Sequence, residues 1–385
     1  MRIAMVTHAF PRWDGDMAGA FIARLGEALV ARDNRVWVVT PADEGQGGRE
    51  VCAGMDVLRV RYSRPERETL AHRGTLVAAV RGPSGLLAAG AMVVKVARAV
   101  RRLVREERVD VVHPHWWIPS GVSVWLRGVP NAVPYVVTLH GTDVTLLNNA
   151  GLRWLAKRVL RGASGVTAVS SYLAERAAEL CGVRTSAVQP MPAAVGRFTA
   201  ASKGGGGVVT VGRLIPQKRI ADVIDAVAKL RDRLGKPALT VIGDGPLHNS
   251  LERRAQDHGI DVRFTGRVEP EELPALIADA DVFALPAIGE GFGLAAAEAL
   301  MAGVPVVVTR DGGGLLDIVS DGPAGRVVAG GDVDALAAAL HEVATDPNAR
   351  AAAVVEGNRW KERLSAATVA ESFERIYSNL DEGHA

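Results

Sequence analysis

Two glutamates follow a predicted buried strand, and their spacing suits a ligand rich in hydroxyl groups. Glu290 lies in a glycine-rich loop and Glu298 follows about two turns later in a helical pattern, so both carboxylates are predicted to face one pocket. Carboxylates accept hydrogen bonds from sugar hydroxyls, and the helix start offers amide N–H groups to a phosphate. The alternative, a loop glutamate and a solvated helix glutamate, leaves an unpaired charge in an apolar helix. The loop residues predicted to contact the ligand are Gly291, Phe292, Gly293 and Leu294.

Two cations follow the first strand predicted in the second half of the chain. They are Arg213 and Lys218, and an α/β sheet usually binds a pyrophosphate at that place. Arginine can donate two parallel hydrogen bonds to a phosphate, and a lysine near a helix start adds a point charge. We therefore predict that they bind a diphosphate and stabilise charge that develops on it. The alternative is a pair of surface cations on a loop.

Two further turns also end predicted strands and give weaker signals. Main-chain groups there could hold a base or a phosphate, but tight strand-to-helix turns explain the glycines equally well. The residues are Gly243, Gly245, Gly266, Arg267 and Val268.

His140 ends a predicted strand in the first half of the chain. Ligand-binding side chains gather at the carboxyl ends of parallel strands, so this imidazole could donate to a sugar hydroxyl or stabilise charge on a leaving group. A structural histidine is the alternative. A nearby cluster comprises His113, His115, Trp116 and Trp117. It lacks a third metal ligand, so we predict no metal site there but a cleft wall or an acceptor contact.

The elements that position these residues alternate along the whole chain. Short β-branched runs and alanine-rich helical patterns predict βαβ units around parallel sheets. At 385 residues the chain exceeds the size at which one core keeps growing, so two domains are expected. Four consecutive glycines at 204–207 predict a mobile linker. The expected fold class is α/β, with two doubly wound Rossmann-like domains facing across a cleft.

The predicted boundaries give an N-terminal domain over residues 1–199, a C-terminal domain over 200–364, and a helix over 365–385 that packs back on the first domain. Strands are predicted over 2–7, 35–40, 56–61, 109–113, 135–139, 165–169 and 186–189, and then over 208–211, 238–242, 262–265, 282–285, 304–309 and 326–328.

Charge and composition narrow the class of protein. The chain has 45 basic and 43 acidic residues and a formal net charge of +2, too small and dispersed for nucleic acid to be the expected partner. Two cysteines form no disulfide framework and suit a reducing cytosol. The N-terminal apolar run is too short for a signal peptide, and the stretch near residues 86–94 falls short of the roughly 18 residues that span a bilayer. A soluble, cytoplasmic protein is expected.

A basic amphipathic helix is predicted after that stretch. Its cations are Lys95, Arg98, Arg101, Arg102, Arg105 and Arg108. We expect a core-packed helix with a solvated basic face, and peripheral docking on anionic lipid is the less favoured alternative.

Together these motifs resemble the retaining GT-B glycosyltransferases, in particular the large family-four group that includes sucrose synthase-like and phosphatidylinositol mannosyltransferase-like enzymes. The resemblance covers nearly the whole chain. Its carriers are Glu290-Gly291-Phe292-Gly293 with Glu298, Gly212-Arg213-Leu214 with Lys218, Gly243-Asp244-Gly245-Pro246, Ala280-Asp281-Val282-Phe283, Gly303-Val304-Pro305-Val306 and Thr138-Leu139-His140-Gly141. By this resemblance residues 1–199 form the acceptor side and residues 200–364 bind a nucleotide-sugar donor.

The resemblance also implies roles for single residues. Arg213 and Lys218 would bind the donor diphosphate, Glu298 the ribose, Glu290 the transferred sugar, and His140 the sugar near its 6-hydroxyl. A hexose-type sugar would pass from a nucleotide sugar, with UDP favoured over GDP, by front-face displacement with retention. The departing diphosphate itself can take the acceptor's proton. No cofactor and no divalent cation are required, because the cations and a helix N-terminus stabilise the leaving group.

Three departures from the family pattern limit what is carried over. The family's paired glycines in its first loop appear here as Gly15-Asp16-Met17-Ala18-Gly19, a common Pro-Asn-Gly-Val-Asp segment reads Pro190-Met191-Pro192-Ala193-Ala194, and a usual glutamate is Asp317. The first two lie on the acceptor side or at a hinge, so the acceptor stays open between a small molecule, a glycan and a lipid. The residues predicted on the acceptor side are Asp16, Met17, Gly19, His115, Trp116 and Trp117.

Other functions remain as alternatives. The main alternative among enzymes is a nucleotide-sugar epimerase of the same architecture. The main alternative among non-enzymes is a protein that binds a nucleotide sugar without turnover. The spacing of Glu290 and Glu298 disfavours the epimerase and also a phosphorylase. A dinucleotide-dependent dehydrogenase is disfavoured because the turn at Gly243-Asp244-Gly245 lacks the third glycine of the Rossmann fingerprint.

Overall fold

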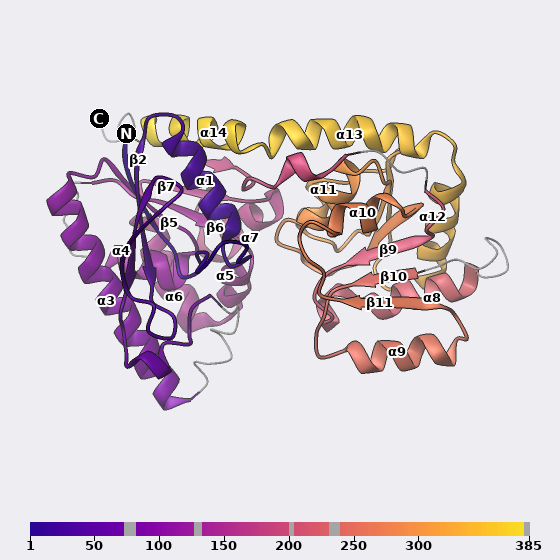
Figure 1. Cartoon of the computed structure of the whole chain (residues 1–385), viewed down its shortest axis with the longest axis horizontal. Helices are drawn as coiled ribbons and strands as arrows, with labels where there is room; N and C mark the ends of the chain where they lie inside the picture. The colour runs from indigo at the N-terminus through magenta and orange to yellow at the C-terminus, as the bar shows by residue number, and fades with distance from the viewer. Residues whose placement is uncertain (73–81, 127–132, 200–203, 231–238, 381–385) are drawn as a thin grey trace. The chain divides into compact units, whose positions relative to one another are not determined.

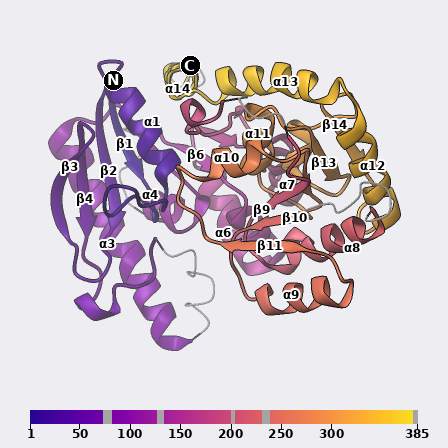
Figure 2. The same ribbon diagram turned by 45° about the vertical axis from the view of Figure 1, so that its right-hand side comes forward.

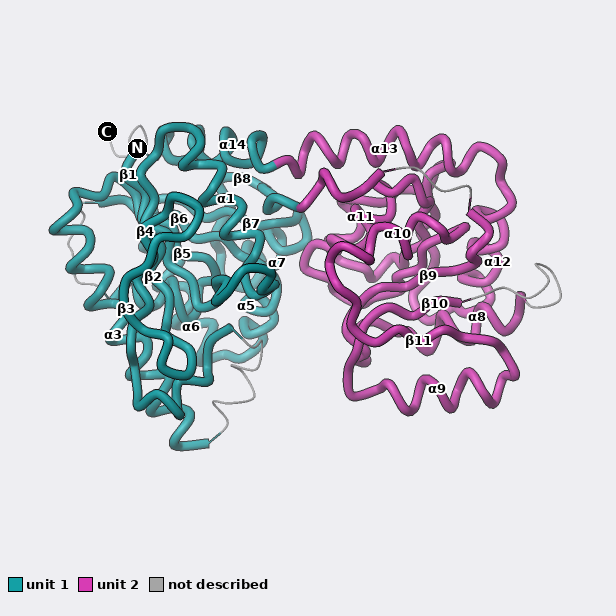
Figure 3. The backbone as a smooth tube through the Cα atoms, viewed as in Figure 1, with its two compact units in different colours: residues 1–193, 366–385 teal, residues 194–365 magenta. Residues whose placement is uncertain are grey.

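The computed structural model describes residues 1–72, 82–126, 133–199, 204–230 and 239–380 (Figure 1). The chain divides into two compact units (Figure 3): unit 1 comprises Met1–Ala193 and Ala366–Ala385, and unit 2 comprises Ala194–Ser365. The sequence placed the first boundary after residue 199. The division falls earlier, and Arg197, on the unit 2 side of it, pairs with Glu271 of the same unit, their Nη2 and Oε1 atoms lying 3.0 Å apart.

Unit 1 is built on parallel strands. Its elements are β1 (Arg2–Val6), α1 (Ala20–Val30), β2 (Arg35–Pro41), β3 (Gly48–Cys52), β4 (Met55–Val60), α3 (Pro83–Glu107), β5 (Val111–Pro114), α4 (Val122–Trp125), β6 (Val136–Leu139), α5 (Thr142–Thr145), α6 (Ala150–Arg161), β7 (Gly165–Ala168), α7 (Ser171–Cys181), β8 (Ala187–Val188) and α14 (Ala366–Ser378). One sheet has the order β3-β4-β2-β1-β5 and the other β6-β7-β8. Bridges from Val112 to Tyr135 and from His115 to Thr138 set β6 beside β5.

The antiparallel edge strand β3 was not predicted. Its residues Gly48, Arg49 and Glu50 are exposed and break the apolar pattern, so β3 gains its hydrogen bonds only from its hairpin partner β4. Sequence periodicity reports burial, and an exposed edge strand carries little of that signal.

Unit 2 is a single parallel sheet with helices on both faces. Its elements are β9 (Val208–Val211), α8 (Ile220–Leu230), β10 (Leu239–Ile242), α9 (His248–Asp257), β11 (Val262–Gly266), α10 (Leu273–Ala278), β12 (Val282–Leu285), α11 (Leu294–Met301), β13 (Val306–Thr309), β14 (Gly325–Val328), α12 (Val333–Thr345) and α13 (Ala349–Arg363). The order β11-β10-β9-β12-β13-β14 is that of a Rossmann fold, which reverses between β9 and β12. Helix α9 lies alongside β11 in both ribbon views (Figures 1 and 2).

The apolar runs of unit 2 explain this packing. Strands β12 and β13 are buried along their whole length, as expected for parallel strands covered on both faces. Apolar residues of α8, α9 and α12 form one core cluster with the sheet, including Val223, Leu251 and Leu340. The site loops that follow β9 and β12 therefore start from a rigid base.

The predicted mobile linker at 204–207 is wrong for the glycines themselves. The amides of Gly205 and Gly207 donate to the Asp281 carboxylate at 2.7 and 3.0 Å, and the Gly206 amide donates to the Asp279 carbonyl at 2.9 Å. Gly205 has a φ of 103°, which side chains rarely adopt. The glycines thus allow the backbone to turn closely around the residues that precede β12. The remainder of the predicted linker, residues 200–203, lies outside the described residues.

Helix α3 combines a buried apolar face with an exposed basic one. Met92, Val96, Val100 and Leu103 are buried, and the helix contacts β1, β2 and β4. Within the described parts of the chain, α3 has the length and composition to cross a membrane, with a mean hydropathy of 1.3 over an 18-residue window of which 22% is buried. The uninterrupted apolar run ends at Lys95 and is too short to span a bilayer, so only the whole helix has the required length.

The last described helix, α14, belongs to unit 1. It packs against α1, and Glu374 accepts hydrogen bonds from Arg32 Nε at 2.8 Å and Asn34 Nδ2 at 2.6 Å. Tyr377 is 2% exposed, and its hydroxyl lies 2.7 Å from Nδ1 of His113. These contacts tie the C-terminal segment to α1, to the turn that follows it and to β5.

Candidate functional site

The two predicted ligand loops of unit 2 start at neighbouring strands. Arg213 and Lys218 follow β9, and Glu290 follows β12, and the sheet order reverses between these two strands. Loops on either side of such a reversal diverge and leave a crevice in which α/β proteins bind ligands. The sequence motifs predicted these residues, and the order of the strands explains why their loops lie next to each other.

Lys218 and Glu290 pair with each other. Nζ of Lys218 lies 2.6 Å from Oε2 of Glu290, and the side chains are 16% and 20% exposed. The neighbouring Gln217 ties the loops further, because its carbonyl accepts the Ile288 amide at 2.9 Å and its Nε2 donates to the Ile288 carbonyl at 3.0 Å. A cation suited to phosphate and a carboxylate suited to hydroxyls are thus held side by side.

A glycine run after β13 supports the backbone of Glu290. The Glu290 amide donates to the Gly312 carbonyl at 3.1 Å, and the Gly314 amide donates to the Glu290 carbonyl at 2.8 Å. A Cβ atom at Gly313, whose φ is 63°, would lie 2.7 Å from the Glu290 carbonyl oxygen, and one at Gly314 would lie 2.4 Å from that of Gly291. This support was not predicted from the sequence, although three consecutive glycines after a predicted strand signal a close backbone approach.

Helix α11 begins at the end of the same loop. Its N-cap is Gly293 with a φ of 93°, and a Cβ atom there would lie 2.2 Å from Leu315 Cδ2. Phe292 is partly exposed and its ring centroid lies 5.9 Å from that of Trp360, whereas Leu294 is exposed at the helix start. Glu298, one turn later, is half-buried between the buried Ala297 and Ala299. Its ribose contact stays a prediction.

The predicted donor-binding glycines after β10 pack against the chain itself. A Cβ atom at Gly243 would lie 2.1 Å from the Gly212 carbonyl oxygen, and one at Gly245 would lie 2.6 Å from that of Leu214. The Leu214 amide donates to the Asp244 carbonyl at 3.0 Å. Both glycines therefore hold the loop that carries Arg213, which explains them without a ligand.

The turn after β11 is more open than the turn after β10. Gly266 has a φ of 66°, and a Cβ atom added there would meet no described atom within 4 Å. Arg267 is exposed and Val268 is half-buried. This turn has room beside it, and its contact with a base stays a prediction.

In unit 1, His140 lies at the carboxyl end of β6, as predicted. Its Nε2 lies 3.2 Å from Nδ1 of His115, and its ring centroid lies 4.4 Å from that of Trp116 and 5.3 Å from that of Phe21. The Asp143 carboxylate accepts the His140 and Gly141 amides at 3.1 and 2.9 Å. Burial raises the pKa of Asp143 to about 6. The turn after β6 is therefore held by its own carboxylate.

Two predicted acceptor contacts are buried. His115 and Trp117 are both 0% exposed, and Trp117 donates through Nε1 to the Asp143 carbonyl at 2.6 Å. Neither side chain can touch an acceptor from these positions, and the prediction of direct contact is corrected for both. Trp116 is half-buried, and its ring contacts His8 edge-on and His140 at a tilt, with ring centroids 4.4 Å apart in both pairs. Across the described residues there is no group of three or more metal-ligating side chains.

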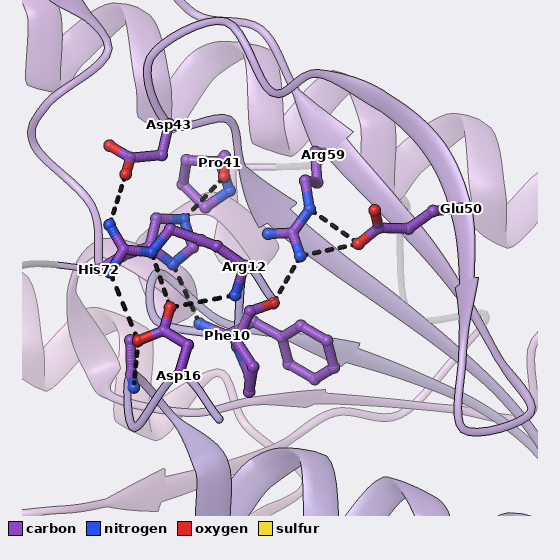
Figure 4. Close-up of polar contacts among 10 residues, drawn as sticks. Phe10, Arg12, Asp16, Pro41, Asp43, Glu50, Arg59 and His72 are labelled. Atoms are coloured by element: carbon purple, nitrogen blue, oxygen red, sulfur yellow. Dashed lines mark hydrogen bonds and ion pairs between the residues drawn. The ribbon is translucent and has the colours of Figure 1, made fainter. Parts of the chain in front are cut away.

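Asp16 does not stand free in the first loop (Figure 4). Its carboxylate accepts from Arg12 Nε at 2.7 Å, and Arg12 also donates to Asp43 through Nη1 at 2.7 Å. A structural role therefore accounts for Asp16, in place of the predicted acceptor contact. Gly19 likewise has a structural explanation, because a Cβ atom there would lie 2.1 Å from the Ala9 carbonyl oxygen and only glycine fits. Met17 is 59% exposed and stays a candidate for contact.

Two more side chains pin this loop to neighbouring strands (Figure 4). Arg59 donates to the Pro11 carbonyl at 2.5 Å. His72 accepts the Phe10 amide at Nδ1, 3.2 Å away, so its Nε2 proton points to the Pro41 carbonyl at 3.0 Å. Sequence reasoning missed Arg59 and His72, because their partners lie 31 or more residues away along the chain, and it missed Arg12, whose second partner Asp43 is equally distant.

Comparisons with known proteins place the chain in a family. Residues 18–195 match the model described as Glycosyltransferase Family 4, and residues 198–360 match Glycosyl transferases group 1. A GDP-mannose-dependent alpha-(1-6)-phosphatidylinositol monomannoside mannosyltransferase of Mycolicibacterium smegmatis is 34% identical over 293 residues, which cover 69% of this chain and 75% of that protein. The chain belongs to glycosyltransferase family 4.

Other relatives of this glycosyltransferase extend over more of its length. A glycogen synthase of Mycobacterium tuberculosis is 28% identical over 404 residues, covering 98% of this chain and 94% of that protein. Among solved structures, sucrose-phosphate synthase of Thermosynechococcus elongatus superposes with a TM-score of 0.80 at 21% identity over 99% of both chains. HepE of Anabaena, in complex with UDP, superposes with a TM-score of 0.73 at 19% identity, covering 98% of this chain and all of that one. The glycosyltransferase thus has the GT-B fold.

Proposed function

We propose that this glycosyltransferase moves a hexose-type sugar from a nucleotide-sugar donor to an acceptor hydroxyl, with retention and without a metal ion. The observation that carries the proposal is the contact of Lys218 with Glu290 where the order of the sheet in unit 2 reverses. A nucleotide sugar has a diphosphate directly joined to a hydroxyl-rich ring. The ammonium and the carboxylate match these two parts in type and in proximity.

In the proposed reaction the acceptor oxygen attacks the anomeric carbon on the face from which the diphosphate leaves. The bond from that carbon to the diphosphate oxygen breaks, and the diphosphate takes the acceptor's proton. Lys218, Arg213 and the start of α11 stabilise the growing negative charge. Glu290 exchanges its bond with Lys218 for hydroxyls of the sugar, and His140 donates to another hydroxyl of the substrate.

The donor base and the acceptor are argued from the relatives. UDP is the donor nucleotide expected from the sequence resemblance, and HepE was solved with UDP. GDP is the second candidate, because the name of the Mycolicibacterium relative specifies GDP-mannose. The relatives' names include a lipid acceptor and a glycan product, so both classes belong in an acceptor screen together with small molecules.

Two measurements test the proposal. Thermal unfolding with UDP, GDP, ADP and TDP identifies the base, since a ligand at 100 times its dissociation constant stabilises by about 2.7 kcal/mol. Proton NMR of the product then gives its anomeric configuration in excess EDTA and in magnesium. We expect a retained configuration and full activity in EDTA. An inverted configuration, or activity restored only by magnesium, contradicts the mechanism. Conversion of the donor sugar in the absence of an acceptor would indicate an epimerase. Nucleotide binding without any product would indicate a non-catalytic protein.

A further inference from the structure

The His113-Pro114-His115 motif at the end of β5 has no part in the proposed reaction, yet its second histidine is rigidly placed. The His115 amide donates to the Val6 carbonyl at 2.9 Å, and the next amide, of Trp116, donates to the Thr138 carbonyl at 2.9 Å. The ring of His115 is 0% exposed. Backbone bonds to β1 on one side and β6 on the other therefore leave this ring little freedom.

The ring of His115 lies between two other imidazoles. On one side it stacks on His113, with ring centroids 4.2 Å apart. On the other side its Nδ1 lies 3.2 Å from Nε2 of His140. Its own Nε2 is buried and has no hydrogen-bonding partner among the residues that the structure describes. His113 is satisfied separately, by Tyr377 and Thr138, each at 2.7 Å.

Burial favours the neutral form of both rings of the pair. Burial lowers the pKa of His115 and of His140 well below the ordinary range. One proton therefore lies between Nδ1 of His115 and Nε2 of His140, and the question is which ring carries it. The answer fixes whether the remaining nitrogen of His140, Nδ1, is a donor or an acceptor.

The buried Nε2 of His115 decides between the two arrangements. If His140 carried the proton, His115 would be protonated at Nε2 and would bury an N–H group without an acceptor. If His115 carries it at Nδ1, its Nε2 is a lone pair. Buried N–H groups without partners are rarer in proteins than under-satisfied acceptors, so the second arrangement is favoured.

We propose that His115 is a positioning residue that donates from Nδ1 to His140 and thereby holds His140 as its Nδ1–H tautomer, with an N–H directed to a sugar hydroxyl. The inference rests on the role of His140 in the proposed function. In this role the buried His115 determines which nitrogen of His140 carries the proton, and it does not contact the acceptor as the sequence predicted.

Nitrogen-15 NMR of the imidazoles in the whole protein tests the tautomer directly, without turnover. Signals of His140 are assigned by their loss in His140→Gln. In the wild type we expect Nδ1 of His140 to carry the proton and Nε2 to be unprotonated. His115→Leu should give a mixture of His140 tautomers, whereas His115→Asn, whose amide can donate from nearly the same place, should restore the wild-type spectrum. A wild-type His140 protonated at Nε2, or a spectrum unchanged in His115→Leu, overturns the proposal.

A matched control separates positioning from folding. Tyr377→Phe removes the hydroxyl that contacts His113, one ring further from His140. It should lower the unfolding temperature while leaving the His140 tautomer unchanged.

Kinetics with donors that lack single hydroxyls then link the tautomer to function. His115→Leu should lose at least tenfold in kcat/KM with the full donor. It should lose little with the donor that lacks the hydroxyl bonded by His140. Equal losses with every donor contradict the directed N–H. Absence of any turnover in the wild type would instead reject the proposed function and leave the tautomer result standing.

Discussion

At the scale of single residues, Lys218 and Glu290 satisfy each other's charge at the site proposed for the donor. The ion pair is 2.6 Å long and its side chains are mostly buried, so it is less screened by solvent than an exposed pair. A diphosphate that binds Lys218 must therefore compete with Glu290, and the carboxylate also repels the phosphates. The pair couples diphosphate binding to release of the carboxylate that the sugar needs.

Glu290→Gln should tighten the binding of UDP or GDP by roughly fivefold, about 1 kcal/mol. The amide keeps the shape of the side chain and removes the charge that competes for Lys218. Turnover should fall in the same variant, because an amide is a weaker acceptor for sugar hydroxyls. Calorimetric titration and steady-state rates measure the two effects.

Asp334→Asn is the control, because Asp334 pairs with Lys229 on the exposed surface of the same unit. It should change neither nucleotide affinity nor turnover. Equal or weaker nucleotide binding in Glu290→Gln would show that the ion pair does not oppose the diphosphate.

At the scale of elements, loops after neighbouring strands support one another through backbone contacts that only glycine allows. Gly313→Ala should displace the backbone of Glu290, since its Cβ atom would lie 2.7 Å from that residue's carbonyl oxygen. We expect at least a tenfold loss in kcat/KM together with a lower unfolding temperature. Gly331→Ala is a matched control, with a φ of 77° and no described atom within 4 Å of the added Cβ.

Gly331→Ala should carry only the strain of its backbone conformation, roughly 1 kcal/mol, and should leave kcat/KM unchanged. If the two alanine variants have the same activity, the glycine run does not position Glu290. Equilibrium unfolding and steady-state kinetics on both variants decide this.

The first loop of unit 1 depends on a cation between two carboxylates (Figure 4). Arg12→Met should lower the free energy of unfolding by roughly 3 kcal/mol, because the carboxylates of Asp16 and Asp43, 8% and 5% exposed, would lose the cation that lies between them. Hydrogen exchange of residues 12–18 should accelerate strongly. Arg102→Met, which breaks the exposed pair with Glu106, should leave both measurements unchanged. Unaltered exchange in Arg12→Met would mean that Arg59 and His72 hold the loop without it.

At the scale of the whole molecule, a cluster of neutral histidines should make folding sensitive to acid. Burial lowers the pKa of His113 to about 3 and that of His8 to about 4. An unfolded histidine binds a proton near pH 6.5, so between that pH and the lowered values the unfolded chain holds more protons. The free energy of unfolding therefore falls as pH falls, by up to about 1.4 kcal/mol per pH unit for each such histidine.

Urea unfolding from pH 7 to pH 4 measures this slope. Asp143 acts in the opposite direction, because its raised pKa of about 6 lets the folded state take up a proton first, but it is one group against several. His113→Phe should flatten the slope by the share of one histidine. A stability that is constant or rises toward pH 4 would show that the cluster is protonated in the folded protein.

What the sequence by itself determined is what local patterns encode. The alternation of strands and helices predicted the parallel sheets and nearly all of their strands, because burial on both faces leaves apolar runs. The motifs around Arg213, Glu290 and His140 predicted which strand ends carry polar side chains. Each of these signals lies within a short stretch of chain.

Only the tertiary structure decided which polar groups remain for a ligand. Asp16 is taken up by Arg12, His115 is buried against His140, Gly243 packs on Gly212, and the glycines before β9 wrap around Asp281. The partners in the last three contacts are separated by 25 or more residues and meet because parallel strands bring their like ends to one edge. A polar residue in a strand-end loop has the same appearance in sequence whether it binds a ligand or its neighbour, since the partner is supplied by the sheet order and not by the local chain.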